Sequence, residues 1–233
     1  MEWLSSALEY LRGANLAATA FRLFLAMLFG GIIGLERGRR RRPAGFRTHI
    51  LVCMGAALAM SISQYVAVTL GQTTDVSRLG AQVINGIGFL GAGTIIVTGK
   101  QEVKGLTTAA GLWASACMGL AIGAGFYECV FLAFLLIFLC IRFLPYLETA
   151  VVERARNMNI YVEFTSMDDV GRIIGQIKAQ NAQIYEVDIT RGKESRAQQP
   201  SAVFSIRLNH RRAHEQVLTA IAELETITMI DEV

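Results

Sequence analysis

NGIGFLGAGTIIVTGKQEVKGLTTAAGLW, the segment from Asn85 to Trp113, is apolar and rich in glycine, and its charged residues are confined to one short loop. In lipid, small residues let helix backbones approach closely, and broken helices are tolerated where they line a polar cavity. The core of a soluble enzyme would not place so many glycines in apolar runs. The segment therefore predicts a packed helical membrane domain.

The rest of the chain divides into two parts by composition. Of its 233 residues, 53% are hydrophobic and 18% are charged, and the mean hydropathy is +0.42, which favours a polytopic membrane protein. The long apolar runs end near residue 146, and the composition from about residue 157 onward is that of a soluble domain. We predict a transmembrane domain at 1–150 and a small soluble domain at 157–233.

The apolar runs predict an α-helical bundle with about five spans of the usual length, roughly 20 residues each. The expected spans are 18–36, 48–70, 79–98, 106–125 and 126–146. Six arginines lie between residues 37 and 47, whereas the loops expected on the opposite side carry only Arg78. The positive-inside rule then places the arginine loop and the C-terminal domain in the cytoplasm and the N-terminus outside.

The C-terminal part has the pattern of an α+β domain. Strands are expected near 159–165, 183–191, 202–209 and 226–233, and helices at 168–181, with Asp168 as N-cap, and at 212–225. This βαββαβ order is the ferredoxin-like arrangement, to which ACT-like domains also belong. His210 and His214 lie four residues apart and form either a metal pair or, as we favour, two exposed surface histidines.

The sequence lacks the motifs of an enzyme or a cofactor site. Gly86 to Gly91 matches G-x-G-x-x-G, but the dinucleotide fingerprint requires a preceding strand, and the segment before Gly86 is expected to be a membrane helix. The glycines are better explained as thinning or breaking that helix. All four cysteines lie in apolar segments and are expected to be buried: Cys53, Cys117, Cys129 and Cys140. We predict no enzymatic activity, no cofactor and no resident metal.

Two groups of polar residues are the candidate ligand-binding or cavity residues. The first is a stripe at helical spacing on the third span, where intramembrane polar groups normally face the interior or a water-filled cavity. Its members are Asp75, Arg78, Gln82 and Asn85. They could bond neighbouring helices together or line a ligand cavity, and Asp75 and Arg78 could simply pair at the surface.

The second group lies near the arginine loop. Its members are Glu36, Arg37, Arg47, Thr48, His49, Lys104, Thr107 and Thr108. Glu36 could neutralise an arginine or bind a cation, although a single carboxylate is a weak site for Mg²⁺. Arg39 to Arg42 are expected to follow the positive-inside rule and to contact anionic lipid.

Small residues recur every four positions in the first and fourth spans and predict close helix packing. The positions are Ala26, Gly30, Gly34 and Gly38 in the first span and Gly111, Ser115, Gly119 and Gly123 in the fourth. Trp113 lies on another face of the fourth span, either as an interior filler or as a cavity residue. A bulky residue at Gly34 or Gly119 is expected to disrupt assembly before it affects any chemistry.

Together these motifs resemble the MgtC/SapB family of bacterial inner-membrane proteins. The resemblance rests on five segments that follow one another along the first four spans: GLER at 34–37, AGFRTH at 44–49, the Asp75, Arg78 and Gln82 stripe, GIGFLGAG at 86–93 and KGLTTAAGLW at 104–113. The C-terminal domain is similar to the ACT-like tail of virulence-associated members, with less specific motifs.

The resemblance implies an inner-membrane location and a link to growth in low magnesium, acid stress and survival of pathogens inside macrophages. It also implies the F-type ATP synthase as a possible protein partner. Two functions remain open: a regulatory membrane protein, which the lack of enzyme motifs and the ordered tail favour, or a transporter or channel for Mg²⁺ or another small ion or solute. A homodimer is expected from the small-residue faces and from the pairing habit of ACT-like tails. The lipid bilayer is the expected surroundings, and nucleic acid is not an expected partner.

Overall fold

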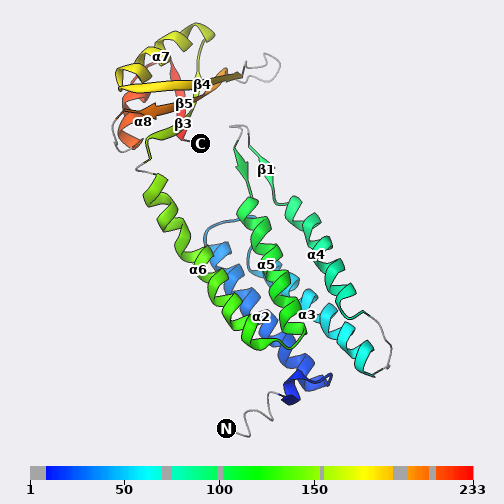
Figure 1. Ribbon diagram of the computed structural model, residues 1–233. Coiled ribbons are helices and arrows are strands. Elements are labelled where there is room, and N and C mark those ends of the chain that lie inside the picture. The colour runs from blue at the N-terminus through cyan, green and yellow to red at the C-terminus, as the bar shows by residue number, and fades with distance from the viewer. Residues whose placement is uncertain are drawn as a thin grey trace. The chain divides into compact units, whose positions relative to one another are not determined.

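The computed structural model describes residues 9–69, 75–98, 102–152, 155–190, 199–209 and 214–232. The chain divides into two compact units, residues Met1–Pro145 and Tyr146–Val233. The first unit is helical and the second is an α+β domain (Figure 1). The predicted fold class, a helical membrane bundle followed by a small α+β domain, is confirmed.

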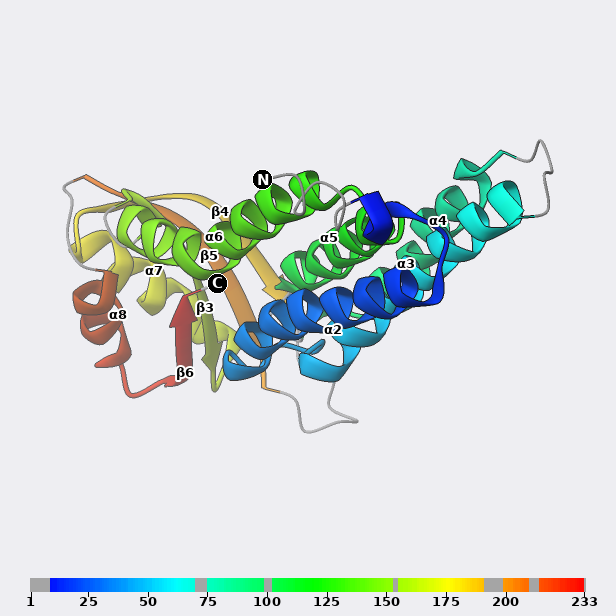
Figure 2. The same ribbon diagram turned by 90° about the horizontal axis from the view of Figure 1, so that it is seen from below.

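Five helices run side by side in alternating directions in the described part of the first unit (Figure 1, and turned by 90° in Figure 2). They are α2 (Leu16–Arg39), α3 (Phe46–Thr69), α4 (Ser77–Ala92), α5 (Leu106–Gly123) and the first part of α6 (Tyr127–Val152). Four of them, α2, α3, α5 and residues Tyr127–Glu148 of α6, are long and apolar enough to cross a membrane. We call the end of the bundle that carries residues 37–47 the arginine end.

The predicted third span is a shorter helix than expected. α4 has 16 residues, about 24 Å at 1.5 Å per residue, whereas the hydrocarbon core is about 30 Å thick. The helix ends at Ala92 because the chain turns into a small hairpin, β1 (Ile96–Val97) and β2 (Val103–Lys104). The hydroxyl of Thr94 donates to the carbonyl of Gly91 (2.8 Å) and helps to close the last turn.

Gly105 joins this hairpin to α5 and requires glycine for two reasons. Its φ is +100°, in the region that favours glycine. A side chain at this position would also overlap the carbonyl of Thr94. The KGLTT segment therefore forms a tight junction in which only the backbone of Gly105 fits.

Small residues hold α2 against α3 and α3 against α5. A Cβ atom at Gly30 would lie 2.8 Å from the carbonyl oxygen of His49, and one at Gly34 would lie 2.8 Å from that of Gly45. On α5, a Cβ atom at Gly119 would overlap the carbonyl of Cys53. The small-residue faces of α2 and α5 are thus occupied within one chain, as close helix packing requires.

Helix α6 packs against α2 through aromatic side chains. Phe29 of α2 lies edge-on to Phe131 and stacks on Phe134, with ring centroids 5.4 and 4.4 Å apart. The remaining surface of α6 is apolar and exposed and includes Leu132, Leu136 and Leu139. Such a surface suits lipid contact, because only 11% of its span is buried by protein.

The second unit has the predicted βαββαβ order. Its elements are β3 (Asn157–Phe164), α7 (Val170–Ala179), β4 (Ala182–Thr190), β5 (Ser201–Leu208), α8 (His214–Ala222) and β6 (Ile227–Glu232). The strands pair antiparallel in the order β4-β5-β3-β6. Alternate residues of β3 and β5 form a core with the apolar faces of α7 and α8.

Two details of this domain differ from the expectation. Ser166, not Asp168, caps the first helical segment by accepting from the backbone N–H of Asp168 (3.3 Å). His214 is buried rather than exposed, with Nδ1 2.7 Å from Glu232 Oε1 and Nε2 2.9 Å from the carbonyl of Ala155. These contacts tie the start of α8 to β6. His210 lies outside the described residues.

Candidate functional site

Four buried polar side chains come together between α2, α3 and α5 near the arginine end. We call them the internal polar cluster: Arg37, His49, Thr108 and Ser115, none more than 4% exposed. Thr108, Gly111 and Ser115 lie on one face of α5, because they are three and four residues apart. Arg37 and His49 approach this face from α2 and α3. The structure thus brings together one part of the second predicted polar group.

Arg37 carries a buried charge that makes a single side-chain hydrogen bond within the part of the chain that the structure describes. Its Nη2 donates to Thr108 Oγ1 at 3.0 Å, and its Nε has no partner among the described residues. Glu36, the nearest carboxylate along the chain, is instead engaged by Arg40 (3.2 Å) and Arg142 (3.7 Å). A buried charge is costly unless it is paired and hydrogen-bonded, so the cluster retains unsatisfied positive charge.

His49 supplies an unused nitrogen in the same region. Its Nδ1 lies 2.9 Å from the carbonyl of Gly45 and therefore donates the hydrogen of that bond. Its Nε2 has no partner among the described residues and faces Gly111, where a Cβ atom would lie 3.6 Å away. The buried hydroxyl of Ser115 is also unpartnered in the described structure. Buried polar groups are usually satisfied, and exceptions call for a functional explanation.

The seam between α3 and α5 closes immediately beyond the cluster. Side chains at Gly119 and Gly123 would overlap the carbonyls of Cys53 and Ala57, so backbone meets backbone there. One and two turns beyond Ser115, the seam has no space for a side chain. The cluster therefore lies at the arginine end of the contact between α3 and α5. Beyond the cluster, toward the opposite end, close backbone packing leaves no space in this contact.

A second buried arginine, Arg22, bonds several helices together at the opposite end of the bundle. It was not among the residues predicted from the sequence. It is 1% exposed. Its guanidinium donates to Gln64 Oε1 (2.8 Å), to the carbonyl of Gly123 (3.0 Å) and to that of Arg12 (2.9 Å). Tyr127 adds a bond to the carbonyl of Leu11 (2.7 Å). These bonds join α2, α3, α5, α6 and the N-terminal segment.

The position of Arg22 has a simple electrostatic reason. The carbonyls at the C-terminus of α5 carry partial negative charge, which favours a cation. The sequence did mark Arg22 as unusual, since it is the only ionisable residue between Leu16 and Leu35. An ionisable residue within a span is a functional candidate by default.

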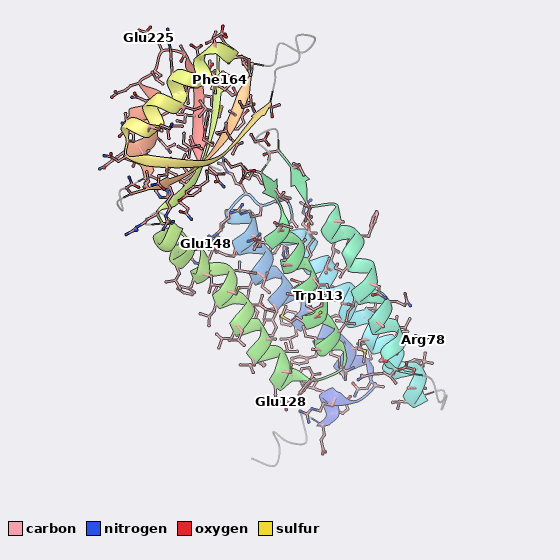
Figure 3. All side chains as sticks on the ribbon, turned by 45° about the horizontal axis from the view of Figure 1, so that its top comes forward. Arg78, Trp113, Glu128, Glu148, Phe164 and Glu225 are labelled. Atoms are coloured by element: carbon pink, nitrogen blue, oxygen red, sulfur yellow. The ribbon has the colours of Figure 1, made fainter. Side chains whose placement is uncertain are left out.

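The predicted stripe on the third span lies on the surface of the single chain. Arg78, Gln82 and Asn85 are exposed on α4 and do not turn into the bundle, contrary to the expectation. Asp75 is exposed and begins the helix by accepting from the backbone N–H (2.9 Å) and the hydroxyl (2.6 Å) of Ser77. These bonds lower the pKa of Asp75. Figure 3 labels Arg78 at this end of α4.

The remaining predicted residues do not join the cluster. Arg47, Thr107 and Lys104 are exposed, and Lys104 pairs with Glu102 at 2.9 Å. Trp113 is 50% exposed on α5 (Figure 3). Thr48 is half-buried and lines a mostly apolar pocket of about 360 Å³ between the ends of α3, α4 and α5. The other lining residues are Pro43, Ala44, Phe89, Leu90, Ala92, Gly93, Thr94 and Leu112.

Residues 23–150 match the MgtC family model. This match covers more than half of the chain and includes the whole internal polar cluster. The chain belongs to the MgtC family.

Three relatives illustrate the similarity of this MgtC-family chain. “Putative magnesium transporter YhiD” of Escherichia coli K12 is 48% identical over 111 residues, 46% of this chain and 51% of YhiD. SapB of Bacillus subtilis is 31% identical over 175 residues, 72% of this chain and 75% of SapB. MgtC of Brucella abortus is 49% identical over 110 residues, 47% of this chain and 44% of that MgtC. The match to YhiD thus spans about half of that relative's length, and no solved structure matches this chain significantly.

Proposed function

We propose that this chain is a regulatory or accessory protein of the bacterial inner membrane. Its bundle binds a small ligand or ion at the internal polar cluster, and its C-terminal domain engages a protein partner in the cytoplasm. The observation that carries the proposal is the set of three buried, unpartnered polar atoms: Arg37 Nε, His49 Nε2 and Ser115 Oγ.

The chemistry of the cluster favours a water molecule, or a small anion that also carries a hydrogen-bond donor for His49 Nε2, over a divalent cation. A guanidinium and a hydroxyl donate hydrogen bonds, and no carboxylate is paired with Arg37 in the described structure. Mg²⁺ prefers carboxylate oxygens and retains several waters. Glu36 could supply one carboxylate, but Arg40 and Arg142 already hold it.

The closed seam supports regulation over passage through the bundle. A permeation path from the cluster along α5 would meet the backbone contacts at Gly119 and Gly123, and then the hydrogen-bonded guanidinium of Arg22. Opening the path would separate α3 from α5 and break the bonds of Arg22. A binding site confined to the arginine end requires neither change.

The physiological setting follows the family resemblance. We propose a role in adaptation to low magnesium and acid stress and in survival inside macrophages, with the F-type ATP synthase as a partner. The arginine end would face the cytoplasm, where anionic lipid attracts basic segments. No catalytic step is assigned to the chain.

A complementation assay with two alanine variants tests the role of the cluster. In Gly111→Ala, the added methyl group fills the space 3.6 Å in front of His49 Nε2 without overlap. Gly55→Ala is the matched control, because a Cβ atom at Gly55 meets nothing within 4 Å. A bacterial strain that lacks its own MgtC-family protein should be rescued in low magnesium by the wild type and by Gly55→Ala but not by Gly111→Ala. Equal rescue by both variants would contradict a functional role for the cluster.

The alternative function is transport of Mg²⁺ or another small ion or solute. The printed name of YhiD favours it, as does the pocket beside Thr48. Deletion of the chain after Arg156 distinguishes the two functions, because it removes the C-terminal domain and leaves the bundle. A regulator should lose the ability to rescue growth, whereas a transporter should retain it.

A further inference from the structure

Helix α4 presents two amide side chains to the surroundings of the chain. Gln82 and Asn85 are exposed near the middle of the helix, and their side chains make no hydrogen bonds within the described structure. Lipid offers no partner for an amide, and intramembrane polar groups normally find one on another helix or in a water-filled cavity. Something other than lipid therefore covers this face.

The surrounding surface of α4 is shaped for another helix. Gln82, Asn85, Gly86 and Phe89 share one face, since they are three, four and seven residues apart. A Cβ atom at Gly86 meets nothing within 4 Å, so a neighbouring backbone can approach closely. The helix is also short, about 24 Å, and association is one way in which a short span is accommodated in a bilayer.

The surfaces that sequence reasoning reserved for dimerisation are not available. Gly30 and Gly34 contact α3, and Gly119 contacts the backbone of Cys53 in the same chain. The exposed surface of α6 is dominated by apolar side chains such as Leu132, Leu135 and Leu136. In the described bundle, the face of α4 that carries Gln82 and Asn85 is thus the intramembrane surface whose polar side chains lack hydrogen-bond partners.

We propose that this face binds the α4 helix of a second copy of the chain, around a two-fold axis along the membrane normal. Such an axis places the same patch on both partners, so the patch must complement itself. Amides do so, because each carries both donors and acceptors. Asp75 and Arg78 add charge complementarity, since both are exposed, they carry opposite charges one turn apart, and each can face its opposite in the second copy. This proposal does not depend on what the internal polar cluster binds.

Disulfide cross-linking in native membranes tests the interface. Gly86→Cys keeps both amides and fits without a clash. It is made in a background whose four native cysteines are replaced by alanine, and Leu136→Cys on the exposed face of α6 serves as the matched control. After mild oxidation, Gly86→Cys should form a band of twice the monomer mass in most of the protein, at least tenfold more than Leu136→Cys.

A second variant links the cross-link to the amides. Adding Gln82→Leu and Asn85→Leu to Gly86→Cys should reduce the dimer band at least fivefold while the amount of folded protein in the membrane, measured by size-exclusion chromatography in detergent, stays the same. Equal cross-linking of Gly86→Cys and Leu136→Cys, no cross-linking of either, or a product whose mass matches a different protein would overturn the proposal. So would a dimer band that the leucine substitutions leave unchanged.

Discussion

Arg22 and Arg37 are two buried guanidinium groups near opposite ends of the helical bundle. Protein groups satisfy their hydrogen-bonding needs to different extents. Arg22 donates to four backbone carbonyls and to Gln64 within 3.4 Å, so its burial is compensated. Arg37 makes one bond to Thr108 and leaves its Nε without a partner in the described structure. We therefore assign a structural role to the first and a binding role to the second.

Replacing Arg22 by leucine should destabilise the bundle by about 3 kcal/mol or more, because buried carbonyls lose their donor. Thermal unfolding in detergent, followed by tryptophan fluorescence, measures the effect. Arg47→Leu is the control, since Arg47 is exposed and its replacement should change stability by less than about 0.5 kcal/mol. Equal melting temperatures for the two variants would show that the Arg22 network is not a stabilising lock.

Replacing Thr108 by valine should leave the bundle folded and impair rescue of growth. Valine keeps the volume but removes the hydroxyl that accepts from Arg37, at a cost of roughly 1–3 kcal/mol for a buried hydrogen bond to a charge. Thr107→Val, one position earlier and exposed, is the matched control. Full rescue by Thr108→Val in the complementation assay would argue against a role for Arg37.

At the scale of the helices, substitutions at Gly111 and Gly119 test the binding role and the packing role of α5 separately. Both lie on the same face of α5, but a Cβ atom at Gly111 has ordinary contact distance, whereas one at Gly119 would overlap the carbonyl of Cys53. Gly119→Ala should thus cost at least about 2 kcal/mol through overpacking. Gly111→Ala should be neutral or slightly stabilising, because alanine is the better helix former. A Gly119→Ala variant as stable as Gly111→Ala would contradict the close α3–α5 contact.

Sequence patterns predicted the elements better than the directions in which the elements face. The apolar runs and the strand alternation indicated every major helix and strand, because length and periodicity depend on local residue order. The stripe of Gln82 and Asn85 was expected inside the bundle, but it lies outside. The inward face of an apolar helix depends on its neighbours, which the pattern of α4 does not encode. The end of α4 at Ala92 likewise depends on the tight contact of Gly105 with Thr94.

The same limit applies to the candidate site. Glu36, Arg37, His49 and Thr108 were predicted as part of a group near the arginine loop and all four are buried, and the last three belong to the internal polar cluster together with Ser115. Arg47 and Thr107 were grouped with them only through proximity along the chain, and their side chains are exposed. A shift of one residue turns a helical side chain by about 100°, and this separates Thr108 from Thr107.

At the scale of the whole molecule, the chain consists of a helical bundle with a buried polar cluster near its arginine end and an α+β domain. The close α3–α5 contact and the hydrogen-bonded Arg22 support the proposed regulation over transport. The interface proposed on α4 would place two such bundles side by side without using the faces that pack α2, α3 and α5. Transport and regulation then make opposite predictions for the isolated protein.

Ion flux into liposomes that contain the purified protein is the most direct test of whether the chain regulates without transporting. Mg²⁺, K⁺ and H⁺ are compared for wild type, Gly111→Ala and the Gln82→Leu/Asn85→Leu double variant, with empty liposomes as the baseline and an ionophore as the positive control. A regulator that does not transport should give flux equal to the baseline from protein that remains folded and monodisperse. Saturable wild-type flux that is lost in Gly111→Ala would contradict this prediction, because the internal polar cluster would then lie on a permeation path.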